Sequence, residues 1–68
     1  MKQYKFSVYF VGSGEEIVMA FCIRDAIILA CAERIKKGYN IFATSCKNWD
    51  LNTVISLNSE NPAVIVNL

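Results

Sequence analysis

Apolar and polar residues alternate along the beginning of the chain, as expected for a β-strand. The even positions of the run 4–11 form one strongly apolar face: Tyr4, Phe6, Val8 and Phe10. The odd positions form a mixed face: Lys5, Ser7, Tyr9 and Val11. Because successive side chains of a strand point to opposite sides of the sheet, this run predicts a strand with one buried face.

A second strand is predicted for residues 16–22, EIVMAFC, after the loop sequence GSGEE. Gly12 and Gly14 in that loop allow the positive φ values of a hairpin turn. Both faces of the second strand are apolar, so we expect it to be central in its sheet. On the sheet face opposite the main core we expect four residues: Val11, Val18, Ala20 and Cys22.

The segment 24–37, RDAIILACAERIKK, is predicted to be a helix. Asp25 lies near its start, where a carboxylate complements the helix dipole and can cap free backbone amides. Lys36 and Lys37 followed by Gly38 are typical of a helix end. Apolar residues surround the middle of the segment, so we expect the helix to be covered on more than one side.

Three further strands are predicted, at 39–47, 53–57 and 63–68, with a turn at KNWDLN and a loop at 58–62. The order β-β-α-β-β-β predicts one α+β domain spanning 1–68, with one helix packed on a mainly antiparallel four- to five-stranded sheet. In layout only, this order resembles small partner-binding modules such as antitoxin domains of the HicB type, which run strand, strand, helix, strand. The sequence carries no motif diagnostic of that family.

Composition adds an expectation about partners. The chain is 54% hydrophobic and 19% charged, against roughly 45–50% and 25% for an average soluble domain. A domain of 68 residues cannot bury that much apolar side chain, so we expect self-association or a protein partner. The longest apolar run, AIILACA at 26–32, is far shorter than the roughly 20 residues of a membrane span. With no continuous apolar leader at the N-terminus, we expect no membrane contact and a cytoplasmic location.

The sequence offers little for catalysis or metal binding. It contains no histidine, and its three cysteines are too widely spaced for a metal site or a disulfide framework: Cys22, Cys31 and Cys46. We expect these cysteines to act as small core residues. The GSG loop precedes a strand and carries Glu15 and Glu16, which is unfavourable for phosphate binding. We therefore expect no enzyme activity, no cofactor and no metal.

Trp49, the only tryptophan, lies in the predicted turn between the strands 39–47 and 53–57. It could cap one end of the core, or it could project as an anchor for a partner. The candidate partner-binding residues are Trp49, Tyr9, Val11, Val18, Asn48 and Asp50. They predict a small non-enzymatic interaction module, an inhibitor or accessory factor of a kind frequent in phages and mobile elements. It would bind a protein partner, or a second copy as a homodimer, through an apolar sheet face or the Trp49 hairpin.

Two alternatives remain open. Aromatic and basic residues could bind single-stranded nucleic acid, and the candidates are Tyr9, Lys5, Arg34, Lys36 and Lys37. Against this reading, the net charge is only +1, whereas phosphate binding usually requires a clearly basic surface. A structural subunit of a larger assembly would have the same sequence features as an interaction module.

Overall fold

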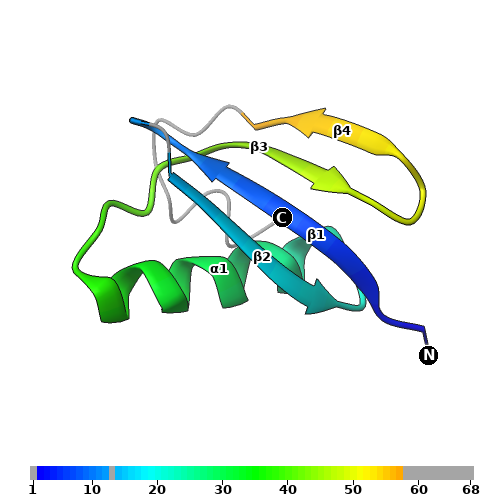
Figure 1. The fold of residues 1–68 in the computed structure, drawn as a ribbon, viewed down its shortest axis with the longest axis horizontal. Helices are drawn as coiled ribbons and strands as arrows, with labels where there is room; N and C mark the ends of the chain where they lie inside the picture. Colours follow the sequence, from blue (N-terminus) through cyan, green and yellow to red (C-terminus); the bar gives the residue numbers. More distant parts are fainter. Residues whose placement is uncertain (1, 13, 58–68) are drawn as a thin grey trace.

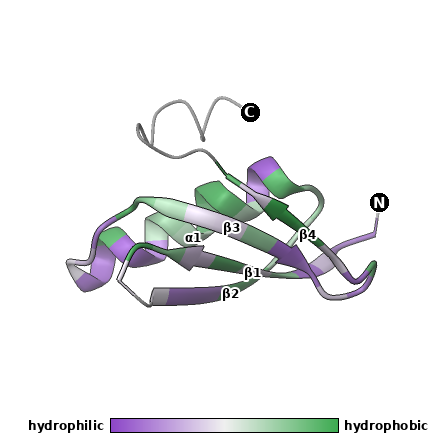
Figure 2. Cartoon of the chain, turned by 90° about the horizontal axis from the view of Figure 1, so that it is seen from above, coloured by the Kyte–Doolittle hydropathy of each residue, from purple (hydrophilic) through white to green (hydrophobic). Residues whose placement is uncertain are grey.

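One helix packs against one side of a four-stranded antiparallel sheet (Figures 1 and 2). The computed structural model describes residues 2–12 and 14–57. Its elements are β1 (Tyr4–Phe10), β2 (Gly14–Ala20), α1 (Ile23–Lys37), β3 (Ala43–Asn48) and β4 (Thr53–Ser56), and the strand order is β2-β1-β3-β4. The predicted α+β architecture is confirmed. The predicted loop at 58–62 and strand at 63–68 lie outside the described residues.

The core lies between α1 and the even-numbered face of β1, as the alternation predicts. Phe6, Val8 and Phe10 are buried there. From the helix, mostly small residues pack against them: Ala26, Ile27, Ala30 and Cys31. The other two strands of the core contribute Ala20 from β2, and Ala43 and Cys46 from β3. The small residues of α1 let the helix approach the sheet closely, so a short chain can still exclude water from one face.

Both ends of α1 lie close to their predicted positions. Cys22 is the N-cap and makes no side-chain capping bond, while Asp25 lies in the first turn, where its charge complements the helix dipole. At the other end Gly38 has a φ of 77°, a left-handed conformation that favours glycine.

Within the part of the chain that the structure describes, no helix is long and apolar enough to cross a membrane.

The prediction that the second strand is central in the sheet is wrong. Among the four strands that the structure describes, β2 lies at the edge and β1 and β3 occupy the middle. The placement of Val18 and Ala20 on the open face is also wrong. Val18 pairs with Phe6 on the helix side, and Ala20 is buried in the core. Ile17 and Met19 point to the open face instead. The apolar character of both faces therefore reflects an exposed apolar surface and not a central position.

Two further expectations differ from the structure. Only one stripe of α1 is buried, and Ile28, Leu29 and Ile35 on its other sides are exposed. The third strand begins at Ala43 and not at residue 39, because the preceding segment forms a loop. In that loop the Asn40 side chain accepts a hydrogen bond from the Phe42 N–H at 3.1 Å, which stabilises a turn in place of a strand.

Candidate functional site

The sheet face that α1 leaves uncovered carries side chains from all four strands. In the register, Ile17 lies opposite Ser7 and Met19 opposite Lys5. Ser7 in turn lies opposite Lys47, and Lys47 opposite Val54. Neighbours in register on one face are in reach of one another. These side chains therefore form one continuous surface, from the β2 edge to β4.

Trp49 lies on this surface, because the β3–β4 turn folds its side chain back over β1. Its indole Nε1–H donates a hydrogen bond of 2.7 Å to the Ser7 hydroxyl. Its backbone N–H donates to the Lys5 carbonyl at 2.9 Å. Ser7 has no exposed surface although it points away from the core. Trp49 therefore neither caps the end of the core nor projects freely from the turn.

Two lysines flank the indole ring. The Lys47 Nζ lies 3.6 Å from a Trp49 ring centroid, and the Lys5 Nζ lies 5.4 Å away. Ammonium groups at these distances are attracted to the negative face of the ring. The turn is held further by Asp50, whose carboxylate accepts a hydrogen bond from the Lys5 N–H at 2.8 Å. These contacts within the chain therefore hold the tryptophan side chain in place.

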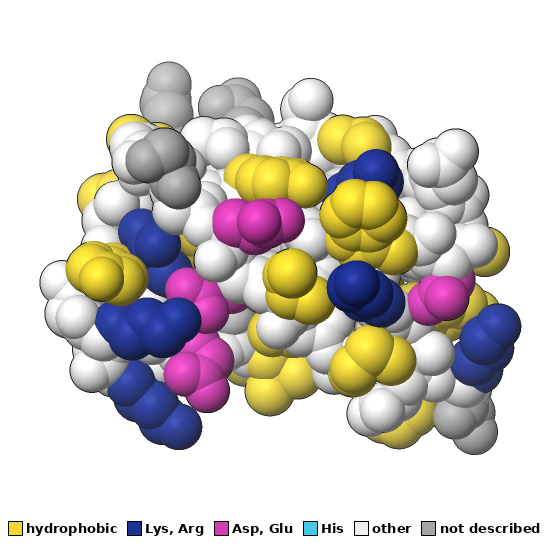
Figure 3. Space-filling view, in the orientation of Figure 1, with side chains coloured by type: hydrophobic (Ala, Val, Ile, Leu, Met, Phe, Trp, Pro, Cys, Tyr) yellow, Lys and Arg dark blue, Asp and Glu magenta, His cyan; other side chains and the backbone are white. Residues whose placement is uncertain are grey.

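Much of this surface is apolar and exposed. Ile17 is 57% exposed, Met19 51%, Trp49 43% and Val54 62%. We call this surface the Trp49 face, and its members are Lys5, Ser7, Tyr9, Ile17, Met19, Lys47, Trp49 and Val54. In the side of the molecule that Figure 3 shows, hydrophobic side chains lie at the surface together with basic and acidic ones.

The structure separates the predicted partner-binding residues into three groups. Trp49 and Tyr9 lie on the Trp49 face, where Tyr9 is half-buried. Val11 is exposed at the β1–β2 turn, and its N–H donates to the Phe42 carbonyl at 3.0 Å. The remaining three serve the fold: Val18 packs against the core, Asn48 accepts a hydrogen bond from the Leu51 N–H, and Asp50 accepts one from the Lys5 N–H.

The sequence did not identify four residues as members of the Trp49 face: Ile17, Met19, Lys47 and Val54. The signal was present, because the alternation places Ile17 and Met19 together on one side of the second strand. Both sides of that strand are apolar, however, so the pattern could not tell which side met the helix. The five residues proposed for nucleic-acid binding are also divided: Lys36 and Lys37 end α1, at the opposite end of the molecule from the β3–β4 turn (Figure 1).

All three cysteines are free thiols, but their surroundings differ. Cys31 and Cys46 are buried, as predicted, whereas Cys22 is exposed and is not a core residue. Burial raises the pKa of the Cys46 thiol to about 11. Burial also raises the pKa of Cys31, and the nearby charge of Arg34 partly opposes this effect. Among residues 2–12 and 14–57, no three potential metal ligands of the His, Cys, Asp and Glu types lie together.

Comparison with known proteins provides no template for this surface. No family model matches the chain, and no curated protein or solved structure matches it.

Proposed function

We propose that this chain is a small non-enzymatic protein-interaction module that binds a protein partner through the Trp49 face. The observation that carries the proposal is the exposure of Ile17, Met19, Trp49 and Val54 on a single sheet face. Such a module would act as an inhibitor or accessory factor, through contact with its partner at this surface.

The chemistry of the face supports a protein partner. Aromatic residues and methionine are enriched at the centres of protein interfaces, and charged residues lie around them. Trp49 and Met19 match the first class. The basic Lys5 and Lys47 lie beside the Trp49 ring, and the Asp50 carboxylate accepts a hydrogen bond from the Lys5 N–H. Because Trp49 is already held by Ser7, binding would not have to order its side chain.

Site-specific photo-crosslinking tests this proposal. A photoreactive amino acid is placed at Ile17, on the Trp49 face, and as a matched control at Ile28, which is exposed on α1. We expect a discrete protein adduct in cells of the native host from position 17 and none from position 28. Trp49→Ala should remove the adduct, because it deletes the largest apolar side chain of the face.

The outcome also identifies the kind of partner. An adduct of twice the protein's mass, with sedimentation as a dimer that Trp49→Ala converts to a monomer, would show that the partner is a second copy. An adduct of another mass would indicate a different protein. Equal adducts from positions 17 and 28, or a monomer without any adduct, would contradict the proposal.

Single-stranded nucleic acid is a second candidate, favoured by one specific observation. Lys5 and Lys47 stand beside the exposed ring of Trp49, and Tyr9 shares the face. Aromatic rings next to cations can stack on bases and contact phosphates. This candidate predicts binding to an oligothymidine that weakens steeply with salt and is reduced in Lys5→Gln and Lys47→Gln. Salt-independent retention, or none at low salt, would exclude it.

A further inference from the structure

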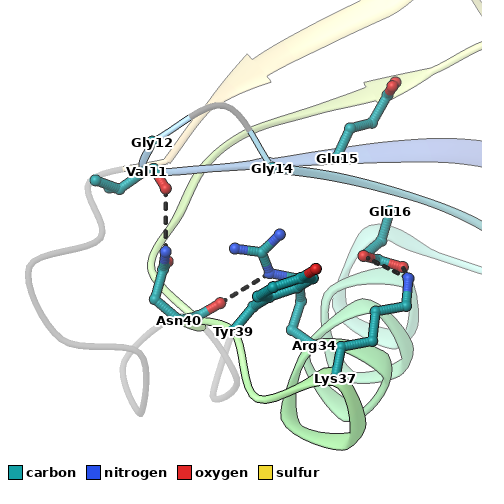
Figure 4. Close-up of a pocket in the computed structure, with 9 residues that line it drawn as sticks. All are labelled: Val11, Gly12, Gly14, Glu15, Glu16, Arg34, Lys37, Tyr39 and Asn40. Atoms are coloured by element: carbon teal, nitrogen blue, oxygen red, sulfur yellow. Dashed lines mark hydrogen bonds and ion pairs between the residues drawn. The ribbon is translucent and has the colours of Figure 1, made fainter.

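A cavity of about 520 Å³ lies away from the Trp49 face, between the β1–β2 turn and the end of α1 (Figure 4). Its walls include Val11 and Gly12 of the turn, Gly14 at the start of β2, and Tyr39 and Asn40 after the helix. Its volume is in the range of small-molecule sites, roughly 300–1,000 Å³. The groups that line it are mostly polar, unlike those of the Trp49 face.

Arg34 is the central residue of this cavity, and it is held rigidly. Only 5% of its surface is exposed. Its guanidinium carbon lies 4.6 Å from the Phe10 ring centroid and 4.9 Å from that of Tyr39, and the two rings fix the guanidinium by cation–π contacts. The Arg34 Nε–H also donates to the Asn40 carbonyl at 2.9 Å. The Asn40 side chain is anchored in turn by a bond of 3.1 Å to the Val11 carbonyl.

Gly14 makes room for the outer part of this guanidinium. A Cβ at position 14 would clash with the Arg34 Nη1. The backbone conformation at position 14 does not itself require glycine. Among the described residues, positive φ values occur only at Gly12, Gly38 and Asn52. The absence of a side chain at Gly14 therefore serves the position of Arg34.

The charges around the cavity leave Arg34 without a carboxylate partner among the described residues. Glu16 also lines the cavity, but its carboxylate accepts a hydrogen bond from the Lys37 Nζ at 2.9 Å. Figure 4 shows Glu15 directed away from Arg34, and Glu16 directed toward Lys37. The four charged residues of the lining, Glu15, Glu16, Arg34 and Lys37, sum to zero. Since Lys37 and Glu16 pair with each other and Glu15 is directed away, the Arg34 guanidinium is the cation that faces the cavity without a paired carboxylate among the described residues. Buried arginines are usually paired with an anion.

We propose that this cavity is a binding site for a carboxylate, with Arg34 as the anion-binding residue. A guanidinium offers two parallel N–H donors that match the two oxygens of a carboxylate. Since the rings of Phe10 and Tyr39 already fix the guanidinium, binding would cost little side-chain order. A monoanion matches the single guanidinium that has no carboxylate partner among the described residues. A phosphate dianion is disfavoured because the Glu16 carboxylate lies in the cavity wall.

NMR titration tests the site. The probe is acetylglycine, which carries one carboxylate, and the matched ligand control is its neutral amide, acetylglycinamide. At constant ionic strength, we expect acetylglycine to shift the Arg34 Nε–H resonance and the amides of residues 12, 14 and 40 along saturating curves. The neutral amide and sodium chloride should leave them in place.

Two variants and one control locate the binding group. Gly14→Ala keeps every charge but displaces the guanidinium, and Arg34→Lys keeps the charge but loses the paired donors. Each should weaken binding at least 10-fold. Lys36→Gln removes one exposed positive charge from the same helix end and should change binding less than 2-fold. Unchanged amide shifts in β3 and β4 show that each variant is folded.

Several results would overturn the proposal. These are shifts that do not saturate, equal shifts with the neutral amide, and undiminished binding by folded Gly14→Ala protein. A comparable loss in Lys36→Gln would show general charge attraction and not a site. Tighter binding of inorganic phosphate than of acetylglycine would overturn the assignment to carboxylates.

Discussion

The indole Nε1–H of Trp49 donates a hydrogen bond of 2.7 Å to the Ser7 hydroxyl. The bond joins the β3–β4 turn to the central strand β1. It explains why a serine on the open face of the sheet has no exposed surface. Although its ring is held by this bond, Trp49 is still 43% exposed to solvent. The only tryptophan of the chain is thus both part of the fold and available for contact.

Removal of this hydrogen bond should destabilise the protein measurably. Trp49→Phe keeps an aromatic ring but loses the donor, and Ser7→Ala removes the acceptor. We expect each to lower the free energy of unfolding by about 1 kcal/mol. In a double-mutant cycle followed by urea unfolding, the two changes should couple by about 0.5–1.5 kcal/mol. Strictly additive effects would mean that the bond contributes no stability in solution.

Two isoleucines of the same size provide a test of which face is the core. Ile27 is fully buried on α1, whereas Ile17 is 57% exposed on the open face. Ile27→Ala should lower the free energy of unfolding by about 2–5 kcal/mol, because it leaves a cavity. Ile17→Ala should change it by no more than about 0.5 kcal/mol. A large loss from Ile17→Ala in the isolated monomer would contradict the sheet assignment.

The three thiols should react at very different rates. At pH 8, Ellman's reagent should modify Cys22 quickly, because this thiol is exposed. Cys46 and Cys31 should react only on unfolding, since burial blocks access to them and raises the pKa of both thiols. We expect one reactive thiol per chain in buffer and three in urea. Cys22→Ser should abolish the fast phase, and its persistence would place another cysteine at the surface.

Stability should decrease at alkaline pH. The pKa of Cys46 is raised from its ordinary value of 9.0 to about 11 in the folded protein. The unfolded chain therefore releases this proton first, and stability present below pH 9 is lost progressively as the pH rises to 11. The pKa of Lys37 is raised by its hydrogen bond to Glu16, which acts in the same direction above pH 10.5. Urea midpoints measured between pH 8 and 11 should fall, and less so in Cys46→Ala.

Local patterns predicted the elements that depend on neighbouring residues. The alternation at 4–11 identified β1 and its buried face, and Lys36, Lys37 and Gly38 identified the end of α1. Such signals are local because strand periodicity and helix caps involve contacts within a few residues. The hairpin turn around Trp49 was also predicted, since turn-forming residues surround it.

The hydrophobic pattern gave wrong predictions for elements that are apolar on more than one side. β2 has apolar side chains on both faces, and only the pairing of Val18 with Phe6 shows which face meets the helix. α1 is apolar nearly all round, and only its packing shows that one stripe is buried and Leu29 is not. In both cases we expected more side chains to be buried than the structure shows. Exposed apolar residues cannot be distinguished from core residues by their positions in the sequence alone.

By itself, the sequence determined the α+β class, the order of the described elements and the apolar face of β1, because these follow from contacts between near neighbours. Only the tertiary structure decided the strand order, the exposed side of β2, the position of Trp49 over Ser7 and the enclosure of Arg34 between Phe10 and Tyr39. Phe10 and Arg34 are 24 positions apart in the chain, and Ser7 and Trp49 are 42 apart. Contacts of that range depend on how the whole sheet and helix pack, which no local pattern encodes.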